Sequence, residues 1–491
     1  MGFKADRQGV QKIRQAMQEK DWQWDASTKD APLIEASKIL EPNEQKWPRE
    51  YQGEIIYAQG CSNQNWQRFL KGISIGNEAF KAFCQALELD WEDIVDPTSN
   101  NQLQKRQERA RFIEYFWVGR EQLINQLTAK LKENCRLLVL TGITGIGKTS
   151  LGYQLVKVLE IEGFQRSKPL DFENDDTTKD FTSVAADLLI KWHEKVTTDE
   201  RKQPEILLNR LLYKLVNNCY LLQIESLEIL LEGNKDTGWN NFRDEYQGEL
   251  WVKFFQKLLA APECQSRIIV TSQHFPTQSQ EWGYAERWCC HLLEGLEEFE
   301  QLGLFEKTGI EVEAVSPNQP YLKRIGAAYE GHPLALLVIA GEIMNEPFFG
   351  DVVAYWEKWG HEIKKIEKAQ QQEKIESEKD NFRLQRYTKD LRQLVEKRIE
   401  MTFQRLLDDF PDAYKLLCFG AVYRRGVPQE AWNKGLKYGG EYLQDMMDVL
   451  FDRYLVEIGE TGYMDVEEVV RQHNLIRSVA SAHSKKYKSR R

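Results

Sequence analysis

Residues 136–150 read RLLVLTGITGIGKTS, and this stretch predicts how the largest part of the chain folds. The apolar run 137–140 predicts a buried strand, and residues 151–160 predict a helix. Between them, Gly142 to Thr149 fits the phosphate-loop pattern G-x-x-x-x-G-K-[ST] at every fixed position. A glycine turn without function is the alternative, and the strand and helix on either side of the loop disfavour it.

The loop residues have the chemistry to bind a nucleotide. Glycines let a loop wrap closely, so that backbone N–H groups point at phosphate oxygens, and the helix N-terminus adds the positive end of its dipole. Lys148 is expected to reach the β- and γ-phosphates, and the Thr149 hydroxyl to bind Mg²⁺. The predicted nucleotide-binding residues of the loop are Gly142, Thr144, Gly145, Ile146, Gly147, Lys148, Thr149 and Ser150.

Two further apolar runs, 220–224 and 267–271, predict strands, with helices at 183–195 and 207–216 before them. Strands alternating with helices indicate a parallel sheet covered on both faces. Glu225 ends the first run, where an acid would hold the metal with Thr149; a solvated strand-end glutamate is the alternative. The polar residues 271–273 end the second run and either face the γ-phosphate or simply terminate the strand.

Composition excludes several other classes of protein. The 491 residues carry a net charge of −10, so no global positive field favours nucleic acid or an anionic membrane. The eight cysteines form no C-x-x-C pair, and Cys289-Cys290 is expected to be two buried structural thiols rather than a zinc site. The start has no signal-peptide core, and the longest apolar run, 333–341, is too short to cross a bilayer. A cytoplasmic protein with no membrane partner is expected.

The chain divides into segments of different character, and the expected fold class is an α/β P-loop NTPase sheet domain flanked by all-α modules. Finer expectations are a short helix at 51–58 and a small hairpin of 455–458 with 463–466. The expected segments are a helical module at 1–98, a linker at 99–112, the nucleotide-binding domain at 113–290, a helical domain at 291–346, a charged helical connector at 347–390, a C-terminal domain at 391–484 and a basic tail at 485–491.

Six short motifs occur in the order found in one family, the NB-ARC group of STAND nucleotide switches, which residues 117–480 resemble, the bacterial and cyanobacterial members above all. The motifs are VGRE at 118–121, the phosphate loop, the acidic strand at 222–226, TSQ at 271–273, GHPLAL at 331–336 and QHNLIR at 472–477.

The resemblance implies a site for ATP or ADP with Mg²⁺, a helical ARC-type domain at 291–346 and a winged-helix domain at 391–484. It places Val118, Gly119 and Arg120 around the adenine and Pro333 near the base. It places Gln273 at a sensor position near the γ-phosphate. His473 is implied to meet the β-phosphate of ADP in a resting state, although a histidine on a helix is often only a packing residue.

Three departures from the family pattern bear on hydrolysis more than on binding. Glu225-Ser226 stands where the family usually has aspartates, and Ser226 cannot polarise an attacking water as a carboxylate can. Gln273 replaces an arginine, and Asn474 replaces the aspartate after the histidine. At most a slow ATPase is expected, because the loop backbone dominates nucleotide capture whereas transition-state contacts need charge.

Residues 62–72 and 80–91 resemble a repressor-type helix-turn-helix domain, with 62–70 as the recognition helix. Asn63, Gln64, Gln67 and Arg68 have the chemistry to read base edges. Residues 1–100, however, hold 12 Lys and Arg against 16 Asp and Glu, whereas phosphate contacts need positive charge. A protein-interaction module is favoured, with DNA binding through 62–70 as the alternative.

The predicted function is therefore an ATP/ADP-binding signalling switch, closed with ADP and open with ATP. The open form is expected to assemble into a homo-oligomer. The family continues into a repeat-rich sensor after the winged helix, whereas this sequence stops at Arg491. The sensor is therefore expected to be absent or supplied by another protein, and a protein effector or sensor is an expected partner. The alternatives are a nucleotide-gated transcription regulator that binds DNA, an active NTPase, and a scaffold locked by nucleotide.

Overall fold

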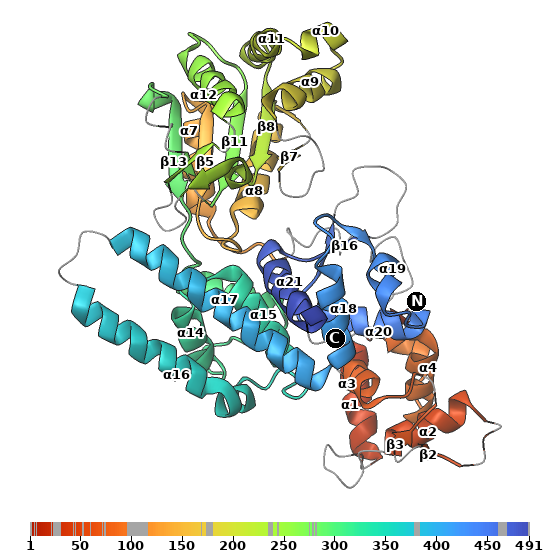
Figure 1. Ribbon diagram of the computed structural model, residues 1–491. Coiled ribbons are helices and arrows are strands. Elements are labelled where there is room, and N and C mark those ends of the chain that lie inside the picture. The colour runs from red at the N-terminus through yellow and green to blue at the C-terminus, as the bar shows by residue number, and fades with distance from the viewer. Residues whose placement is uncertain are drawn as a thin grey trace. The chain divides into compact units, whose positions relative to one another are not determined.

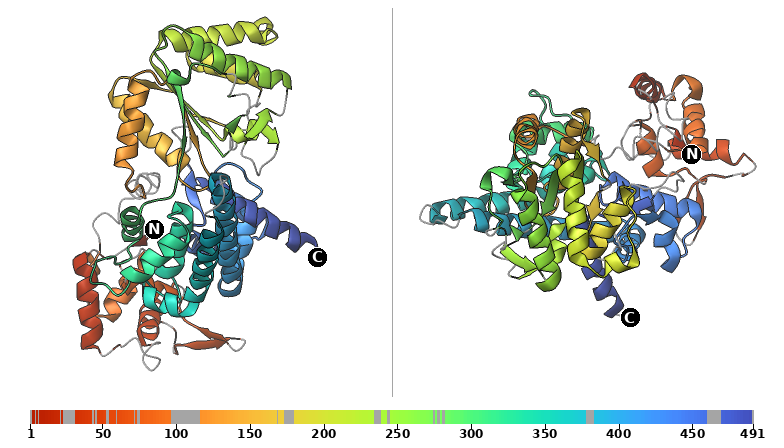
Figure 2. Two further views of the ribbon diagram at one scale, coloured as in Figure 1. Left: turned by 90° about the vertical axis from the view of Figure 1, so that its left-hand side faces the viewer. Right: turned by 90° about the horizontal axis from the view of Figure 1, so that it is seen from above.

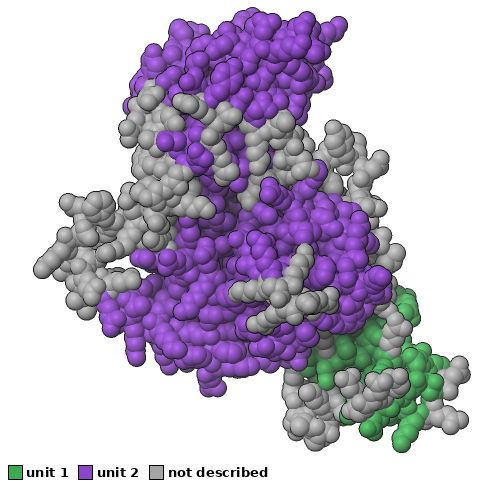
Figure 3. Space-filling model, viewed as in Figure 1, with its two compact units in different colours: residues 1–111 green, residues 112–491 purple. Residues whose placement is uncertain are grey.

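A computed structural model divides the chain into two compact units, residues 1–111 and 112–491 (Figure 3). The predicted linker 99–112 lies outside the described residues. In the first unit the structure describes residues 2–3, 5, 7–20, 22, 31–42, 44, 46–51, 54–58, 60–70, 72 and 75–95. In the second it describes 116–167, 169–172, 180–233, 239–242, 245–273, 275–276, 279, 282–377, 383–459 and 469–489.

The first unit is mainly helical. Its core centres on Trp66, whose ring lies 5.5 Å from that of Phe69 and 5.1 Å from that of Phe83. Aromatic pairs at such distances add about 0.5–1.5 kcal/mol each beyond the area they bury. The elements are β1 (Gly2–Phe3), α1 (Arg7–Glu19), α2 (Ala31–Leu40), β2 (Arg49–Tyr51), β3 (Glu54–Ile56), α3 (Asn63–Leu70), β4 (Ile75–Gly76), α4 (Asn77–Ala86) and η1 (Trp91–Asp93).

The predicted helix at 51–58 is wrong, because β2 and β3 form an antiparallel hairpin there. The β-branched Ile55 and Ile56 favour a strand over a helix. The helix expected at 62–70 is confirmed as α3. Of the residues proposed to read bases, Gln67 has its Oε1 oxygen buried inside the unit, and the Gln64 side chain lies outside the described part. A helix-turn-helix role stays a prediction.

A six-stranded parallel sheet organises the second unit (Figure 1), as the sequence predicts. The strand that leads into the phosphate loop is β5, and β11 lies between it and the acidic strand β8. All described pairings in this sheet are parallel, so the carboxyl ends of the strands share one edge. The strands are β5 (Leu137–Thr141), β6 (Gln165–Arg166), β7 (Leu170–Asp171), β8 (Tyr220–Glu225), β11 (Arg267–Ser272) and β13 (Trp288–Leu292). This is the fold of P-loop NTPases.

Helices cover both faces of this sheet (Figure 2), which explains why its strands are continuous apolar runs. Leu138 and Leu140 share one core cluster with α7 and α8, while Leu137 and Val139 share the other with α9, α11 and α12. Full burial of each such side chain contributes about 1.5–3 kcal/mol. The helices are α7 (Glu121–Lys132), α8 (Lys148–Ile161), α9 (Phe181–Lys191), α10 (Thr198–Arg201), α11 (Pro204–Asn217) and α12 (Glu245–Ala260). A smaller sheet comprises β9 (Leu231–Gly233), β10 (Trp239–Phe242) and β12 (Phe275–Pro276).

The strand β13 has no counterpart in the sequence prediction, and it corrects the expectation for Cys289 and Cys290. Both residues lie on this strand at the end of the sheet, where Cys289 is only partly buried and Cys290 is exposed. The Cys289 and Cys135 Sγ atoms lie 3.4 Å apart, too far for a disulfide bond. An edge strand has a neighbour on one side only, which leaves such side chains partly open.

The helical region that follows packs against the sheet domain and continues its core. Its helices are α13 (Glu298–Lys307), α14 (Gln319–Ala328), α15 (Pro333–Met344), α16 (Val352–Ser377) and α17 (Arg383–Asp409). The C-terminal lobe, defined as residues 411–459 and 469–489, contains α18 (Pro411–Gly420), β14 (Val427–Pro428), α19 (Gln429–Trp432), α20 (Gly440–Asp452), β15 (Glu457–Gly459), β16 (Val469–Arg471) and α21 (Asn474–Ser489). One core cluster runs from α8 through the helical region into this lobe.

The first half of α16, within the charged helical connector expected at 347–390, is part of the core. Tyr355, Trp356 and Ile363 of α16 belong to the core, since their spacing forms an apolar stripe along the helix. Buried ion pairs hold this part of the unit together: Glu342 of α15 pairs with Arg398 and Arg405 of α17, and Glu362 of α16 pairs with the same two arginines.

The C-terminal lobe contains part of the expected hairpin. Residues 455–458 overlap β15, whose partner is β16, while residues 463–466 lie outside the described part of the chain. The helix α21 continues to Ser489 and so includes most of the predicted basic tail. No helix among the described residues combines the length and the apolar character needed to cross a bilayer.

Candidate functional site

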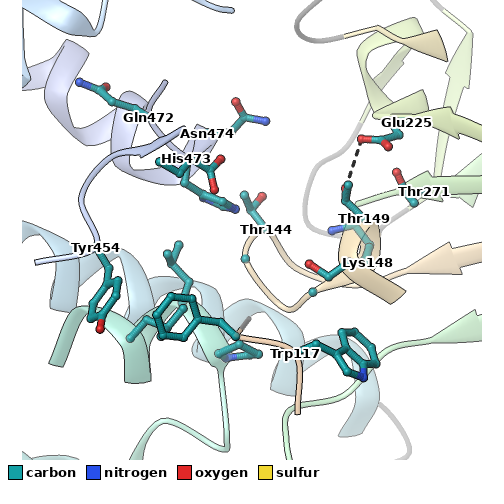
Figure 4. Close-up of a pocket in the computed structure, with 18 of the residues that line it drawn as sticks. Trp117, Thr144, Lys148, Thr149, Glu225, Thr271, Tyr454, Gln472, His473 and Asn474 are labelled. Atoms are coloured by element: carbon teal, nitrogen blue, oxygen red, sulfur yellow. Dashed lines mark hydrogen bonds between the residues drawn. The ribbon is translucent and has the colours of Figure 1, made fainter. Parts of the chain in front are cut away.

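A cavity of about 220 Å³ lies at the carboxyl edge of the parallel sheet, between the phosphate loop and the C-terminal lobe (Figure 4). The loop and the ends of β8 and β11 form one wall, and residues 454–457 and 471–474 of the lobe form the opposite wall. In open α/β sheets this edge is where ligands bind, because the strand ends and the loops after them meet there.

The phosphate loop keeps a conformation that only glycine allows at two positions. Gly145 and Gly147 have φ angles of 87° and 99°. A Cβ atom on Gly145 would lie 2.8 Å from His332 Cε1, and one on Gly147 would lie 3.1 Å from Arg120 Nη1. Neighbouring side chains therefore approach the loop backbone closely, which a larger residue would prevent.

Lys148 begins α8 and folds back over the loop. Its Nζ donates hydrogen bonds to the carbonyl oxygens of Gly142 at 2.8 Å and Ile143 at 3.0 Å. The ammonium group is therefore held beside the backbone groups that would surround an anion. A cation and a helix N-terminus at one point favour a phosphate there.

Two oxygen-bearing side chains face each other beside the loop. Thr149 Oγ1 lies 3.4 Å from Glu225 Oε2 (Figure 4), and Gln223 Nε2 donates to Glu225 Oε1 at 2.8 Å. Hydroxyl and carboxylate oxygens are the ligands that Mg²⁺ prefers, so the pair fits this metal. No three His, Cys, Asp or Glu side chains of the described residues gather closely enough to bind a metal on their own. A metal here would therefore need further oxygens, which a phosphate ligand supplies.

Gln273 lines the cavity, but its donors are already bonded. Its backbone N–H and its Nε2 donate to the Glu228 carboxylate at 3.2 and 2.9 Å. Glu228 and Asp171 also line the cavity, and sequence reasoning missed both. A polar residue within three positions of a strand end was the signal that could have identified Glu228.

Arg120 is hydrogen-bonded to the phosphate loop. Its Nη2 donates to the carbonyl oxygens of Ile146 at 3.2 Å and Glu294 at 2.9 Å, and its backbone N–H donates to Glu300 Oε1 at 2.5 Å. Burial lowers the pKa of Arg120 to about 10, against the opposing effect of Glu300, so the side chain stays charged at neutral pH. Its hydrogen bonds indicate a role in shaping the loop.

The other end of the cavity is apolar and aromatic. The Phe116 ring meets the Tyr454 ring edge-on, with centroids 5.2 Å apart. The other apolar and aromatic side chains that line the cavity include Trp117, Val118, Leu296, Leu304, Leu334 and Leu337. Such a slot suits a flat ring with polar edges better than a second phosphate.

His332, which the sequence analysis did not single out, joins the helical region to the phosphate loop. Its Nδ1 accepts a hydrogen bond from Ala335 N at 3.3 Å as the N-cap of α15, so Nε2 carries the proton and donates to Thr144 O at 3.1 Å. Burial lowers the pKa of His332 to about 3, so the ring is neutral. Pro333 occupies the first turn of α15, where its missing N–H costs nothing.

The opposite wall contributes His473, just after β16. Its Nδ1 accepts from Leu475 N at 3.3 Å, and burial lowers its pKa to about 4. Figure 4 shows His473 across the cavity from Thr144. Arg471, two residues earlier, also lines the cavity and was missed by sequence reasoning.

The structure brings most of the predicted site residues together. Gly119, Gly142 and Ile146 do not line the cavity, although they shape the segments that do. Those that line it are Val118, Arg120, Thr144, Gly145, Gly147, Lys148, Thr149, Ser150, Glu225, Gln273, Pro333 and His473.

Comparison with known proteins gives distant similarities. No family model matches the sequence. The chain is 28% identical over 384 residues to an uncharacterized WD repeat-containing protein of Nostoc sp.; the match covers 72% of this chain and 28% of the length of that protein. A STAND protein with a tetratricopeptide repeat sensor from Pyrococcus horikoshii superposes with a TM-score of 0.44 and 15% identity, over 76% of this chain and 44% of that one. A Walker-type ATPase of Pyrococcus abyssi superposes with a TM-score of 0.34 and 14% identity, over 74% of this chain and 96% of that one.

Proposed function

We propose that the chain binds ATP and ADP and acts as a signalling switch of the STAND type. The observation that carries this proposal is a single cavity in which the phosphate loop faces His473 of a separate lobe. A ligand that touches both walls can change how firmly the lobe packs, provided that it binds the two arrangements of the protein unequally. ADP bound between Lys148 and His473 would favour this closed arrangement.

The two ends of the cavity support an adenine nucleotide. The phosphates would lie on the loop amides and Lys148, with Mg²⁺ between Thr149 and Glu225. The base would lie in the apolar end beside Val118 and Pro333, where Tyr454 and Phe116 add aromatic edges. When bound, Mg²⁺ would offset the charge of the phosphates and fix their orientation.

ATP hydrolysis by this site would be slow at most. The Gln273 side chain is neutral and its donors are bonded to Glu228, and Ser226 carries no carboxylate to polarise a water molecule. Loss of one preorganised donor to a transition state typically costs about 3–4 kcal/mol. We therefore propose that exchange of ADP for ATP, rather than turnover, sets the state of the protein.

The remaining assignments follow from the motif order. Residues 291–346 would be an ARC-type helical domain, and the C-terminal lobe a winged helix released by ATP. The released form would assemble with further copies through the sheet domain. The curated Nostoc protein is named for WD repeats and is matched over 28% of its length, which supports repeats of this kind as the sensor that acts on the switch.

The test is the replacement Lys148→Ala, with Lys157→Ala on the same helix as the control. In Lys148→Ala, the loss of charge-assisted bonds to two phosphates should weaken the binding of ADP and of ATP by about 100-fold. Lys157 does not line the cavity, so its variant should bind both nucleotides normally. Titration calorimetry on the full chain measures both. Unchanged affinity of Lys148→Ala would refute the site, and the absence of any adenine nucleotide binding by the native chain would refute the function.

A further inference from the structure

Two cysteine thiols touch at the edge of the parallel sheet, away from the nucleotide cavity. Cys135 lies two residues before β5 and is buried, whereas Cys289 lies on the edge strand β13 and is partly exposed. Their Sγ atoms are 3.4 Å apart. Neither residue lines the cavity, so the pair is a separate site.

Strand pairing brings the two thiols together. In the parallel pairing of β13 with β5, Trp288 lies opposite Leu137. One residue earlier on each strand, Arg136 N donates to Arg287 O at 2.7 Å, so the backbone beside Cys135 is held as well. A disulfide bond is about 2.05 Å long, so the two sulfurs would need to approach by about 1.4 Å. Rotation of two side chains on strands that are already paired can supply this movement.

The two thiols differ in reactivity. Because a thiol carries one hydrogen, Cys135 can donate it either to Leu137 O at 3.4 Å or to the Cys289 sulfur. The hydrogen bond from Cys135 and the positive charge of Lys130 lower the pKa of Cys289, against the effect of burial. The thiolate is the nucleophilic form of cysteine, and an edge strand leaves one side of Cys289 open to small molecules. Cys289 is therefore the sulfur expected to react first, with Cys135 beside it.

We propose that Cys135 and Cys289 form a peroxide-sensitive thiol pair, which closes to a disulfide bond on oxidation and reopens when a dithiol reduces it. The bond would tie the edge strand β13 to the residues that lead into β5. In a reducing compartment, the disulfides that form are usually transient and redox-sensing. The nucleotide site uses neither cysteine, so this inference is independent of the proposed function.

The reaction has two steps, with hydrogen peroxide as the oxidant. The Cys289 thiolate attacks one peroxide oxygen and becomes a sulfenic acid, while the O–O bond breaks and the leaving hydroxide takes a proton to become water. The Cys135 sulfur then attacks the Cys289 sulfur, so that the S–S bond forms and the S–O bond breaks. The second hydroxide leaves as water with the proton of Cys135. Two thiols and one peroxide thus give one disulfide and two waters, and thiol–disulfide exchange with a dithiol restores the thiols.

The test treats the full chain with a small excess of hydrogen peroxide, alkylates the remaining thiols, and maps the disulfides by mass spectrometry without reduction. We expect one linked pair of peptides that contain Cys135 and Cys289, which a dithiol separates. Cys219 is the internal reference, because it is exposed and its Sγ donates to Gln265 Oε1 at 3.6 Å. Cys289 should be oxidised at least about tenfold faster than Cys219.

Three variants assign the roles of the two sulfurs. Cys135→Ala should leave Cys289 as a sulfenic acid, which dimedone traps as a stable adduct. Cys289→Ala should leave Cys135 reduced under the same treatment. Cys290→Ala is the matched control, because Cys290 is the next residue on β13 and is exposed, and this variant should form the disulfide as the native chain does.

Several results would overturn the proposal. These are a disulfide between Cys289 and Cys290, oxidation of Cys219 as fast as that of Cys289, and a native chain in which peroxide leaves Cys289 reduced. Conversion of Cys289 to a sulfinic or sulfonic acid without a bridge would also overturn it, because Cys135 would then not be its partner. All four results are read from the native chain, so they decide the proposal even if a variant does not fold.

Discussion

The two walls of the cavity are built in different ways. The phosphate-loop wall is formed largely by one short segment, within 144–150, together with the ends of β8 and β11, and glycine conformations shape that segment. The wall of the C-terminal lobe consists of side chains from two short segments, 454–457 and 471–474, that meet because β15 pairs with β16. The conformation of a loop of backbone amides is fixed by local sequence. A wall formed by a separate lobe can move with that lobe relative to the loop.

The two faces of the sheet show a related difference. The face covered by α9, α11 and α12 has a core confined to the sheet domain. The face covered by α8 shares its core with the helical region and the C-terminal lobe. Packed cores shift between discrete arrangements rather than deform continuously, so the second face can transmit a change at the loop to the lobe.

The largest effect is expected from Gly145→Ala in the loop wall. An alanine at φ 87° costs about 1–2 kcal/mol, and its Cβ would crowd His332 and Leu334 for about 1–3 kcal/mol more. Gly163 has a φ of 95° with open space around it, so Gly163→Ala should show only the cost of the backbone conformation. Denaturant unfolding of both variants measures the difference. If the two variants lose equal stability, the close approach of the loop to α15 plays no role.

An intermediate effect is expected from pH, through the histidine that joins the loop to α15. The pKa of His332 is about 3 when folded and about 6.5 when unfolded, so the unfolded chain takes up the proton first as the pH falls. The free energy of unfolding should therefore decrease below pH 6.5, by about 2 kcal/mol at pH 5. His332→Asn keeps a capping side chain without a titrating ring and should lose this part of the dependence.

The matched variant is His361→Asn, at an exposed position of α16. It should keep the full pH dependence of the native chain. Thermal or denaturant unfolding between pH 5 and pH 7.5 tests the pair. If His332→Asn shows the same slope as the native chain, the buried neutral ring does not contribute to stability.

The smallest effect is expected from the wall of the C-terminal lobe. His473→Ala should weaken the binding of ADP about 3–10-fold, as the loss of one hydrogen bond to a charged group does. It should weaken the binding of ATP less. ATP would favour the open form, in which the lobe no longer contributes the contact. Paired titrations of one preparation with both nucleotides provide the comparison. Equal losses for ADP and ATP would remove His473 from the switch and make the two walls equivalent.

Much of the nucleotide-binding fold could be predicted because the signals are local. The loop from Gly142 to Thr149, the strands that became β5, β8 and β11, and the acid at Glu225 each lie in one short pattern. The helix predicted at 51–58 failed where the β-branched Ile55 and Ile56 favoured a hairpin. The edge strand β13 escaped prediction because its residues, Trp288 to Leu292, carry no strong period.

The sequence by itself determined the phosphate loop, since glycine conformations, the position of Lys148 and the helix start are set by residues adjacent in the chain. The tertiary structure alone decided which side chains face that loop. His332 reaches the loop through helix packing, and Arg471 and Glu228 reach the cavity, whereas His473 of the lobe was anticipated by motif order. Contacts between residues tens to hundreds of positions apart depend on how buried faces pack, and local pattern does not encode that.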